Sequence, residues 1–392
     1  MEAIKLIELI GHGEDSRNQF KREPIGAKDL AEEMVAFSNG TGGHIIFGVD
    51  DDGRVTGLSE RDIQAINSQL SDAANDKVRP SIYPKTEIHR IGENNQLVLV
   101  VVVPEGISKP YADKSGAFWV KSGADKRRIT AREEIQRMLQ SSMLIHADEL
   151  SVEGTTTSDV DMDHFGTFFA QQYGETLDTA LERDDIPVGQ LLNNLGLARA
   201  GNLNLAGLLL FGRNPQRHLP VCVFKAVSFV GNDPAGDRYR DSEDIGGCLR
   251  DLHKGAMSFL TRNLRRPQGE KGFNTEGDLE VPVSALEELV VNMLLHRDYF
   301  ISAPWKVMIF DDRIELISPG MLPNNLTVEN IRNGVSVIRN PLIASFATKE
   351  LPYRGIGTGI RRALAAVPAL GLESDPERNL FTARIPRQAV QS

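Results

Sequence analysis

The chain has few cysteines, no long apolar segment and no excess of positive charge. Its two cysteines, Cys222 and Cys248, are too few for a cysteine-rich zinc module or a disulfide framework, and they indicate a reducing compartment. No apolar run approaches the roughly 20 residues that cross a membrane. The first residues include Glu2 and Glu8 and contain no basic segment before an apolar one, so no secretory signal is predicted. These absences predict a cytoplasmic protein with no membrane partner.

The charge and length of the chain limit the classes of function further. A net charge of −10 argues against a protein that coats nucleic acid with its whole surface, but it is compatible with a local basic face. A length of 392 residues is enough for about two domains, each with its own core. Helix-like and strand-like patterns both occur along the chain, and we therefore predict an α+β protein.

The first 150 residues contain two strand signals. Three glycines within Asn39–Gly43 allow positive φ and close backbone approach, and they lead into the apolar run Ile45–Phe47. This run predicts a buried strand between a helix and an acidic turn at Asp50–Gly53, followed by a return strand. The alternative is a hairpin with a charged tip, and taken alone the stretch favours a structural role. Gln96–Val103 predicts a second buried strand.

Residues 105–132 are locally basic. The segment has three acidic and seven basic side chains, and the basic ones are Lys109, Lys114, Lys121, Lys126, Arg127, Arg128 and Arg132. Such a local excess is what phosphate binding requires, because Lys and Arg supply the sequence-independent part of nucleic-acid affinity. The alternative is a solvated strand–turn–helix segment with ordinary lysines, and the interleaved Tyr111 and Trp119 fit either interpretation.

Several separated segments match a known domain in the same order. They are Glu14 with Phe20-Lys21, then Ala36–Asn39, Gly42–Asp51 and Phe118–Gly123. With these segments, the N-terminal part resembles the Schlafen/AlbA-type domain. The resemblance implies an α/β domain over residues 1–147 that binds DNA or RNA through backbone contacts. Lys21 and the seven basic residues of the segment 105–132 are the candidates for that contact.

The same resemblance implies a candidate metal site. In nucleolytic Schlafen proteins, two glutamates five residues apart and a downstream aspartate hold the metal that cleaves RNA. The matching positions here are Glu14, Gln19 and Asp50, so Glu14 and Asp50 are the candidate catalytic and metal-binding residues. An amide brings no charge to offset a divalent cation, and Gln19 therefore favours binding over cleavage.

Residues 148–275 predict a connecting α/β segment, and its pattern indicates no particular chemical activity. The polar run Ser151–Ser158 predicts a linker. Val221–Val230 predicts a strand, and Asp237–Ile245 a charged loop. An amphipathic helix is predicted over Leu249–Leu264.

The C-terminal part begins with a helical pattern that carries three polar residues. Glu288, Asn292 and His296 are four residues apart and would share one face of a helix. A glutamate there could activate water, and the asparagine could hold Mg²⁺ through its amide oxygen. On spacing alone, a solvated polar stripe is the favoured interpretation.

Two further patterns follow in the C-terminal part. A hairpin is predicted around Asp311-Asp312, and Ser318–Gly320 then turns the chain. Glycines 355, 357 and 359 precede a helical run, which is typical of a phosphate-binding loop because backbone N–H groups face the anion. A tight connection with no ligand needs the same residues.

Together these pieces resemble the divergent GHKL-type ATPase domain of bacterial "RecG-like" proteins and transcriptional regulators. The matching segments are Glu288–Tyr299, Asp312–Gly320, Arg339–Pro341 and Gly355–Gly359. The resemblance implies a GHKL-like α/β sandwich over residues 276–392, with ATP and Mg²⁺ as cofactors. By the same similarity, the proposed roles are Asn292 as the Mg²⁺ ligand, Glu288 as the general base, and Gly320, Gly355, Gly357 and Gly359 in nucleotide binding.

Two departures from that pattern affect the expected function. The usual family has Asp-x-Gly-x-Gly where this chain has Ser318–Leu322, so the aspartate that reads adenine is missing. Proteins of this architecture often continue into a winged helix, whereas this chain ends after the strand-like Leu380–Ile385. DNA binding would therefore depend on residues 105–132.

We therefore expect a nucleotide-responsive, nucleic-acid-binding regulatory protein, acting in transcription or defence. One alternative is a metal-dependent nuclease gated by nucleotide, which would use Glu14 and Asp50. Another alternative is an oligomeric scaffold with a vestigial ATP site. The expected partners are nucleic acid, a nucleotide and further copies of the same chain.

Overall fold

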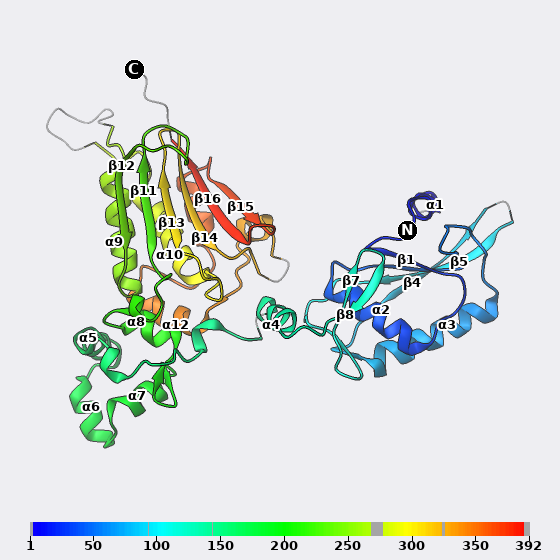
Figure 1. The fold of residues 1–392 in the computed structure, drawn as a ribbon, viewed down its shortest axis with the longest axis horizontal. Helices are drawn as coiled ribbons and strands as arrows, with labels where there is room; N and C mark the ends of the chain where they lie inside the picture. Colours follow the sequence, from blue (N-terminus) through cyan, green and yellow to red (C-terminus); the bar gives the residue numbers. More distant parts are fainter. Residues whose placement is uncertain (1–2, 93, 143, 268–276, 324–325, 388–392) are drawn as a thin grey trace. The chain divides into compact units, whose positions relative to one another are not determined.

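The computed structural model describes residues 3–92, 94–142, 144–267, 277–323 and 326–387. The chain folds as two compact units, Met1–Ile145 and His146–Ser392 (Figure 1). Helices and strands are mixed in both units, which confirms the predicted α+β class.

The N-terminal unit contains short strands and four α-helices among its described residues. Its elements are α1 (Ala3–His12), β1 (Asn18–Lys21), α2 (Ala27–Asn39), β2 (Gly43–Phe47), α3 (Glu60–Asp72), a π-helical turn (Ala73–Lys77), β3 (Val78–Arg79), β4 (Lys85–Ile91), β5 (Gln96–Val103), β6 (Ala112–Asp113), β7 (Trp119–Ser122), β8 (Asp125–Arg128) and α4 (Arg132–Ser141).

A four-stranded sheet in the order β1-β2-β5-β4 forms the centre of this unit (Figure 1). Successive side chains of a strand point to opposite faces, so β2 contributes to two separate cores. Ile45 and Phe47 pack with residues of α2 and α3, whereas Ile46 packs with Leu6 and Ile10 of α1. The sheet is therefore covered on both faces, which explains why β2 and β5 are almost continuously apolar.

The predicted helix, glycine turn and buried strand around Asn39–Gly43 are confirmed as α2, a turn and β2. Gly42 has a φ of 75°, and a Cβ there would lie 2.7 Å from the backbone N of Glu105. A side chain would clash at this close backbone approach. The predicted return strand after the acidic turn is wrong, because the described residues that follow it form isolated bridges, such as Val49 with Val55, and no regular strand.

The C-terminal unit contains one large sheet and a set of helices. Its elements are two 3₁₀ turns (Ala147–Glu149 and Thr157–Asp159), α5 (Met162–Tyr173), α6 (Leu177–Asp184), α7 (Val188–Asn194), β9 (Ala198–Arg199), β10 (Asn202–Leu203), α8 (Leu205–Phe211), a 3₁₀ turn (Pro215–Arg217), β11 (Phe224–Phe229), β12 (Tyr239–Ile245), α9 (Leu249–Asn263), α10 (Val283–His296), β13 (Trp305–Ile309), β14 (Arg313–Pro319), α11 (Val328–Arg332), α12 (Pro341–Glu350), α13 (Gly359–Ala366), β15 (Gly371–Asp375) and β16 (Leu380–Pro386).

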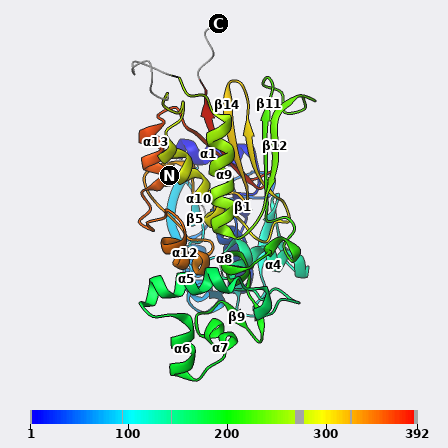
Figure 2. The same cartoon turned by 90° about the vertical axis from the view of Figure 1, so that its left-hand side faces the viewer.

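The large sheet has six strands in the order β12-β11-β13-β14-β16-β15. Only β11 and β13 pair in parallel; the other neighbours are antiparallel. Helices α9 and α10 pack on the sheet, and α13 packs against α10 (Figures 1 and 2). Residues of the strands alternate between buried and more exposed positions, which is the pattern of a sheet with one face in the core. The result is a two-layer α/β sandwich.

Two predictions for the connecting segment are wrong. Asp237–Ile245 is mostly strand β12, not a loop, because its backbone pairs with β11 while charged side chains such as Asp241 bond to Arg262 of α9. Ser151–Ser158 is not a free linker. Thr155 is buried and its hydroxyl accepts a hydrogen bond from the backbone N–H of Leu203 at 2.9 Å.

The large sheet includes strands from both sides of the proposed division at residue 275. Strands β11 and β12 come from the predicted connecting segment, yet they continue the sheet that holds β13 to β16. The proposed division between residues 275 and 276 lies outside the described residues. The limits 1–147, 148–275 and 276–392 therefore remain a proposal.

Among the described residues, no helix is both long and apolar enough to cross a membrane.

Candidate functional site

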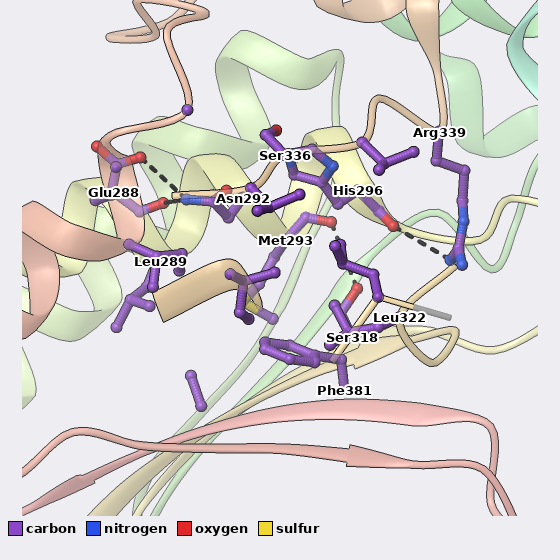
Figure 3. Close-up of a pocket in the computed structure, with 18 of the residues that line it drawn as sticks. Glu288, Leu289, Asn292, Met293, His296, Ser318, Leu322, Ser336, Arg339 and Phe381 are labelled. Atoms are coloured by element: carbon purple, nitrogen blue, oxygen red, sulfur yellow. Dashed lines mark hydrogen bonds between the residues drawn. The ribbon is translucent and has the colours of Figure 1, made fainter. Parts of the chain in front are cut away.

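The C-terminal unit contains a pocket between helix α10 and strands β14 and β16 (Figure 3). Residues within 320–323 and 326–339 and the glycine loop 355–359 complete its lining. The empty space within it, including its opening to solvent, is about 1070 Å³. Its lining is largely apolar with a few polar groups, which is the usual composition of a small-molecule site.

Helix α10 presents its polar stripe to this pocket. The helix forms because apolar residues such as Leu286, Val290 and Leu294 recur at helical spacing and are buried in the core. Asn292 and His296 fall on another face and line the pocket with Glu288. The structure thus brings the three polar residues together in a cavity rather than leaving them as a solvated stripe.

Glu288 is held by two partners at one end of the pocket. Asn292 Nδ2 donates to Glu288 Oε1 at 3.0 Å, and Arg362 Nη2 donates to Glu288 Oε2 at 2.6 Å. The side chain of Glu288 is 10% exposed, whereas that of Arg362 is 47% exposed. Because Asn292 uses its amide nitrogen for Glu288, its amide oxygen is the atom that can accept or ligate.

The glycine loop lies next to Glu288. Gly355 and Gly357 have φ values of 70° and 69°, which few other residues adopt. A Cβ on Gly359 would lie 1.5 Å from Glu288 Oε1, so any other residue at this position would displace the Glu288 carboxylate. Helix α13 begins at Gly359, so its first N–H groups face the end of the pocket that holds Glu288.

The opposite end of the pocket contains His296, Gly320 and Arg339. Burial, together with the nearby Arg339 charge, lowers the pKa of His296 to about 4. The imidazole is therefore neutral at pH 7. Arg339 donates to the backbone oxygens of His296 at 3.3 Å and Met321 at 2.7 Å. Gly320, predicted as a nucleotide-binding residue, lines this end.

Magnesium would need ligands beyond those of the protein. Among the described residues, no three or more His, Cys, Asp or Glu side chains gather into a group that could hold a metal ion. Asn292 offers one amide oxygen in the C-terminal pocket, and Mg²⁺ commonly completes its octahedral shell with water and substrate phosphates. The residues present fit a Mg²⁺ ion that enters with a phosphate group.

The candidate metal site of the N-terminal unit is occupied by the chain's own side chains. Gln19 Nε2 donates to Glu14 Oε1 at 2.5 Å, and the backbone N of Phe20 donates to the same oxygen at 2.6 Å. Lys121 Nζ donates to Gln19 Oε1 at 2.6 Å and lies 3.6 Å from Glu33 Oε2. The side chain of Lys121 is 4% exposed. Gln19 therefore links the candidate ligand Glu14 to a buried ammonium group.

The charge of Lys121 is balanced by acidic neighbours. Burial lowers the pKa of Lys121, and Glu33 and Glu14 act in the opposite direction. Asp50, the other candidate ligand, lies on the acidic turn, where Arg22 Nε is 3.9 Å from its carboxylate. In the part of the chain that the structure describes, Glu14 and Asp50 do not belong to a metal-binding group.

The predicted basic surface over residues 105–132 is largely neutralised. Four of its seven basic residues have a carboxylate within 4 Å: Lys109 with Glu105, Lys121 with Glu33, Lys126 with Glu32, and Arg127 with Glu134. The other three are Lys114, Arg128 and Arg132. Among the described residues, no acidic side chain forms an ion pair with any of these three or with Lys21. The exposed positive surface is therefore smaller than the sequence indicates, and nucleic-acid contact stays a prediction.

Three important contacts were missed by the sequence analysis, namely those of Lys121, Arg339 and Arg362. Arg362 carried a usable signal. A basic residue in the first turn of a helix is unfavourable beside the positive helix end, so an acidic partner such as Glu288 should have been expected. Lys121 and Arg339 carried no such signal, because their partners are distant in sequence or are backbone oxygens.

Comparison with known proteins agrees with these two units. Residues 14–130 match the family model described as "Schlafen, AlbA_2", and residues 303–379 match the model described as "Putative ATP-dependent DNA helicase recG C-terminal". The chain therefore carries a Schlafen AlbA_2 domain followed by a RecG-type C-terminal domain, and the predicted resemblance is confirmed. The second match includes Gly320 and the glycine loop but begins after α10, so Glu288 and Asn292 lie outside it.

One solved structure is similar to this chain over most of its length. The DIP2311 protein from Corynebacterium diphtheriae is 20% identical, with a TM-score of 0.45, and the alignment covers 98% of this chain and 80% of that chain. None of the curated proteins matches the chain.

Proposed function

We propose that the C-terminal pocket binds a nucleoside triphosphate together with Mg²⁺. The observation that carries this proposal is the convergence of Asn292, the glycine loop 355–359 and the start of α13 at one end of the pocket. Backbone N–H groups at a helix start favour a phosphate, and an amide oxygen suits Mg²⁺. The family description of residues 303–379, which refers to ATP dependence, supports ATP as the first ligand to test.

Glu288 and Arg362, which are joined by an ion pair of 2.6 Å, would both lie at the phosphate end of the pocket. Arg362 is half exposed and sits in the first turn of α13, where it would add positive charge to the phosphate end. Glu288 keeps its candidate role as general base. Its carboxylate, however, is already engaged by Arg362 and Asn292, which favours binding over rapid turnover.

The N-terminal unit is proposed to bind nucleic acid, which would make the whole chain a nucleotide-responsive regulatory protein. The family description of residues 14–130 and the exposed cations Lys114, Arg128 and Arg132 support this part. Phosphate contacts by such cations give affinity without sequence preference. A nuclease role is not favoured, because Gln19 and Lys121 fill the place where a catalytic metal would bind.

Calorimetry with Mg²⁺ and ATP tests the nucleotide site. We expect the wild-type protein to bind, and Asn292→Ala to bind at least about tenfold more weakly, because the amide oxygen no longer contributes to the metal shell. Asn194→Ala, in helix α7 and outside the pocket lining, is the matched control and should bind like wild type. A wild-type protein that binds no purine triphosphate would refute the proposal; a stable oligomer in that case would favour the scaffold alternative.

Filter binding of DNA and RNA tests the second half of the proposal. Binding should fall steeply between about 50 and 200 mM salt, because phosphate contacts release counterions. It should also change when ATP is added with Mg²⁺. Binding to neither nucleic acid at low salt contradicts the regulatory model. RNA cleavage with Mg²⁺ that is lost in Asp50→Ala would favour the nuclease instead.

A further inference from the structure

The two ends of the C-terminal pocket differ in charge (Figure 3). Glu288 and Asn292 lie at the end with the glycine loop, whereas Arg339 lies at the opposite end, beyond Met293 (Figure 3). The lining between the ends is mostly apolar. A ligand with its phosphates at the glycine loop would therefore extend its other end toward Arg339.

Arg339 is a cation held by backbone oxygens alone. Its Nη1 and Nη2 donate to the carbonyl oxygens of His296 and Met321, at 3.3 Å and 2.7 Å. Among the described residues, no acidic side chain forms an ion pair with it, although Asp298 lies near enough to stabilise its charge partly. The guanidinium group has further N–H donors, which remain for a ligand.

The turn at Gly320 is shaped to admit this guanidinium group. Gly320 has a φ of 104°, and a Cβ there would lie 2.4 Å from Arg339 Nη1. Any other residue at position 320 would therefore displace Arg339. Burial lowers the pKa of Arg339, which reflects the cost of removing a cation from water. A ligand that accepts hydrogen bonds would offset that cost.

Among the described residues, no carboxylate lines this end of the pocket. Among the described lining residues the one acidic side chain is Glu288, which lies at the other end and bonds to Arg362. Ser318 Oγ is 3.5 Å from the carbonyl oxygen of Met293, and His296 is neutral at pH 7. The Arg339 end therefore offers a positive, donor-rich surface.

This surface matches one class of purine better than the other. A 6-oxopurine presents two neighbouring acceptors, O6 and N7, which an arginine contacts in bidentate fashion. Adenine presents an amino group beside N7, and that amino group would point N–H toward the N–H groups of Arg339. The charge of Arg339 disfavours adenine, and so does a lining that, among the described residues, holds no carboxylate at this end.

We propose that Arg339 is a specificity-determining residue and that the pocket prefers a 6-oxopurine nucleotide, guanosine or inosine triphosphate, over adenosine triphosphate. This inference rests on the proposed nucleotide site and adds the identity of the base.

Calorimetry with four nucleotides and Mg²⁺ tests the inference on the full chain. We expect GTP and ITP to bind at least about tenfold more tightly than ATP, which is the discrimination of one good bidentate contact. The analogue 7-deaza-GTP, which lacks one of the two acceptors, should bind with intermediate affinity. In Arg339→Met the affinities for GTP and ATP should differ by less than about twofold.

Controls separate base recognition from a structural role of Arg339. Arg362→Met, at the phosphate end, should weaken GTP and ATP by the same factor and leave their ratio unchanged. Arg339→Lys keeps the charge but loses the planar fork, so the ratio should fall while the fold is kept. If Arg339 only holds the carbonyl oxygens of His296 and Met321, its variants will change both affinities equally, and the inference is overturned.

The remaining outcomes distinguish this inference from the proposed function. A wild-type protein that binds ATP as tightly as GTP, or more tightly, overturns the base preference while nucleotide binding stands. If none of the four nucleotides binds, the proposed function fails and the base preference fails with it.

Discussion

The buried ammonium group of Lys121 leads to a sharp prediction for the N-terminal unit. Lys121 donates to Gln19 and lies 3.6 Å from Glu33, whose side chain is 7% exposed. Its Nζ also lies 4.8 Å from the centre of the Phe37 ring. Lys121→Met keeps the length of the side chain but removes the positive charge. Glu33 would then be left as a buried carboxylate with a weaker partner.

The size of the effect follows from that burial. Removing one partner of a buried ion pair typically costs about 3–5 kcal/mol, because the remaining charge has lost its compensation. Lys126 Nζ lies 3.9 Å from Glu33 and would compensate part of the loss. We therefore expect a loss of about 3 kcal/mol. For a unit of this size, that corresponds to a melting temperature lower by roughly 10 °C.

Thermal unfolding measures the size of this loss, and hydrogen exchange shows where in the chain it occurs. In Lys121→Met, peptides that cover β7 and α2 should exchange faster, while those of the C-terminal unit should not change. Lys114→Met, an exposed lysine without an ion pair in the described structure, is the matched control and should melt like wild type. A Lys121→Met melting temperature within about 2 °C of wild type would refute the reasoning. Adding Glu33→Gln to Lys121→Met should restore at least half of the lost stability.

Three other predictions concern the pocket and the basic surface. Gly359→Ala should weaken triphosphate binding at least about tenfold in calorimetry with the circular dichroism spectrum unchanged, because its Cβ would lie 1.5 Å from a Glu288 oxygen. Since the pKa of His296 is about 4 folded and near 6.5 unfolded, the unfolded chain binds more protons between these values. Urea unfolding should therefore show stability falling by up to about 3 kcal/mol from pH 6.5 to pH 4, and His296→Gln should remove this part. Arg128→Ala should lower the salt slope of nucleic-acid binding by about one, whereas Arg127→Ala, paired with Glu134, should change it less.

Local patterns in the sequence predicted the elements that build the pocket. The spacing of Glu288, Asn292 and His296 placed them on one helix face, and α10 confirms that arrangement. Glycines 355, 357 and 359 were expected to form a loop before a helix, and α13 does begin at Gly359 after this loop. These features depend on neighbours within a few residues along the chain, which is why a single sequence is enough to predict them.

Contacts between distant segments were beyond the same reasoning. The pair of Glu288 and Arg362 joins two helices whose relative position depends on the packing of the whole unit. The basic count over residues 105–132 omitted Glu32 and Glu33, because these acids come from α2. Strand β12 was missed for a related reason: at the edge of a sheet, backbone pairing with β11 tolerates charged side chains that suggest a loop.

The two candidate sites differ in whether their polar side chains already have partners within the chain. In the N-terminal unit, Glu14 accepts from Gln19 and Gln19 accepts from Lys121, so a metal ion would have to displace a buried ammonium group. In the C-terminal pocket, Arg339 donates only to backbone oxygens, and the glycine loop is partly exposed. A ligand entering the first site must break a satisfied network, whereas one that reaches the Arg339 end of the second site gains contacts there without such a loss. Small-molecule control of this protein is therefore expected to act through the C-terminal pocket.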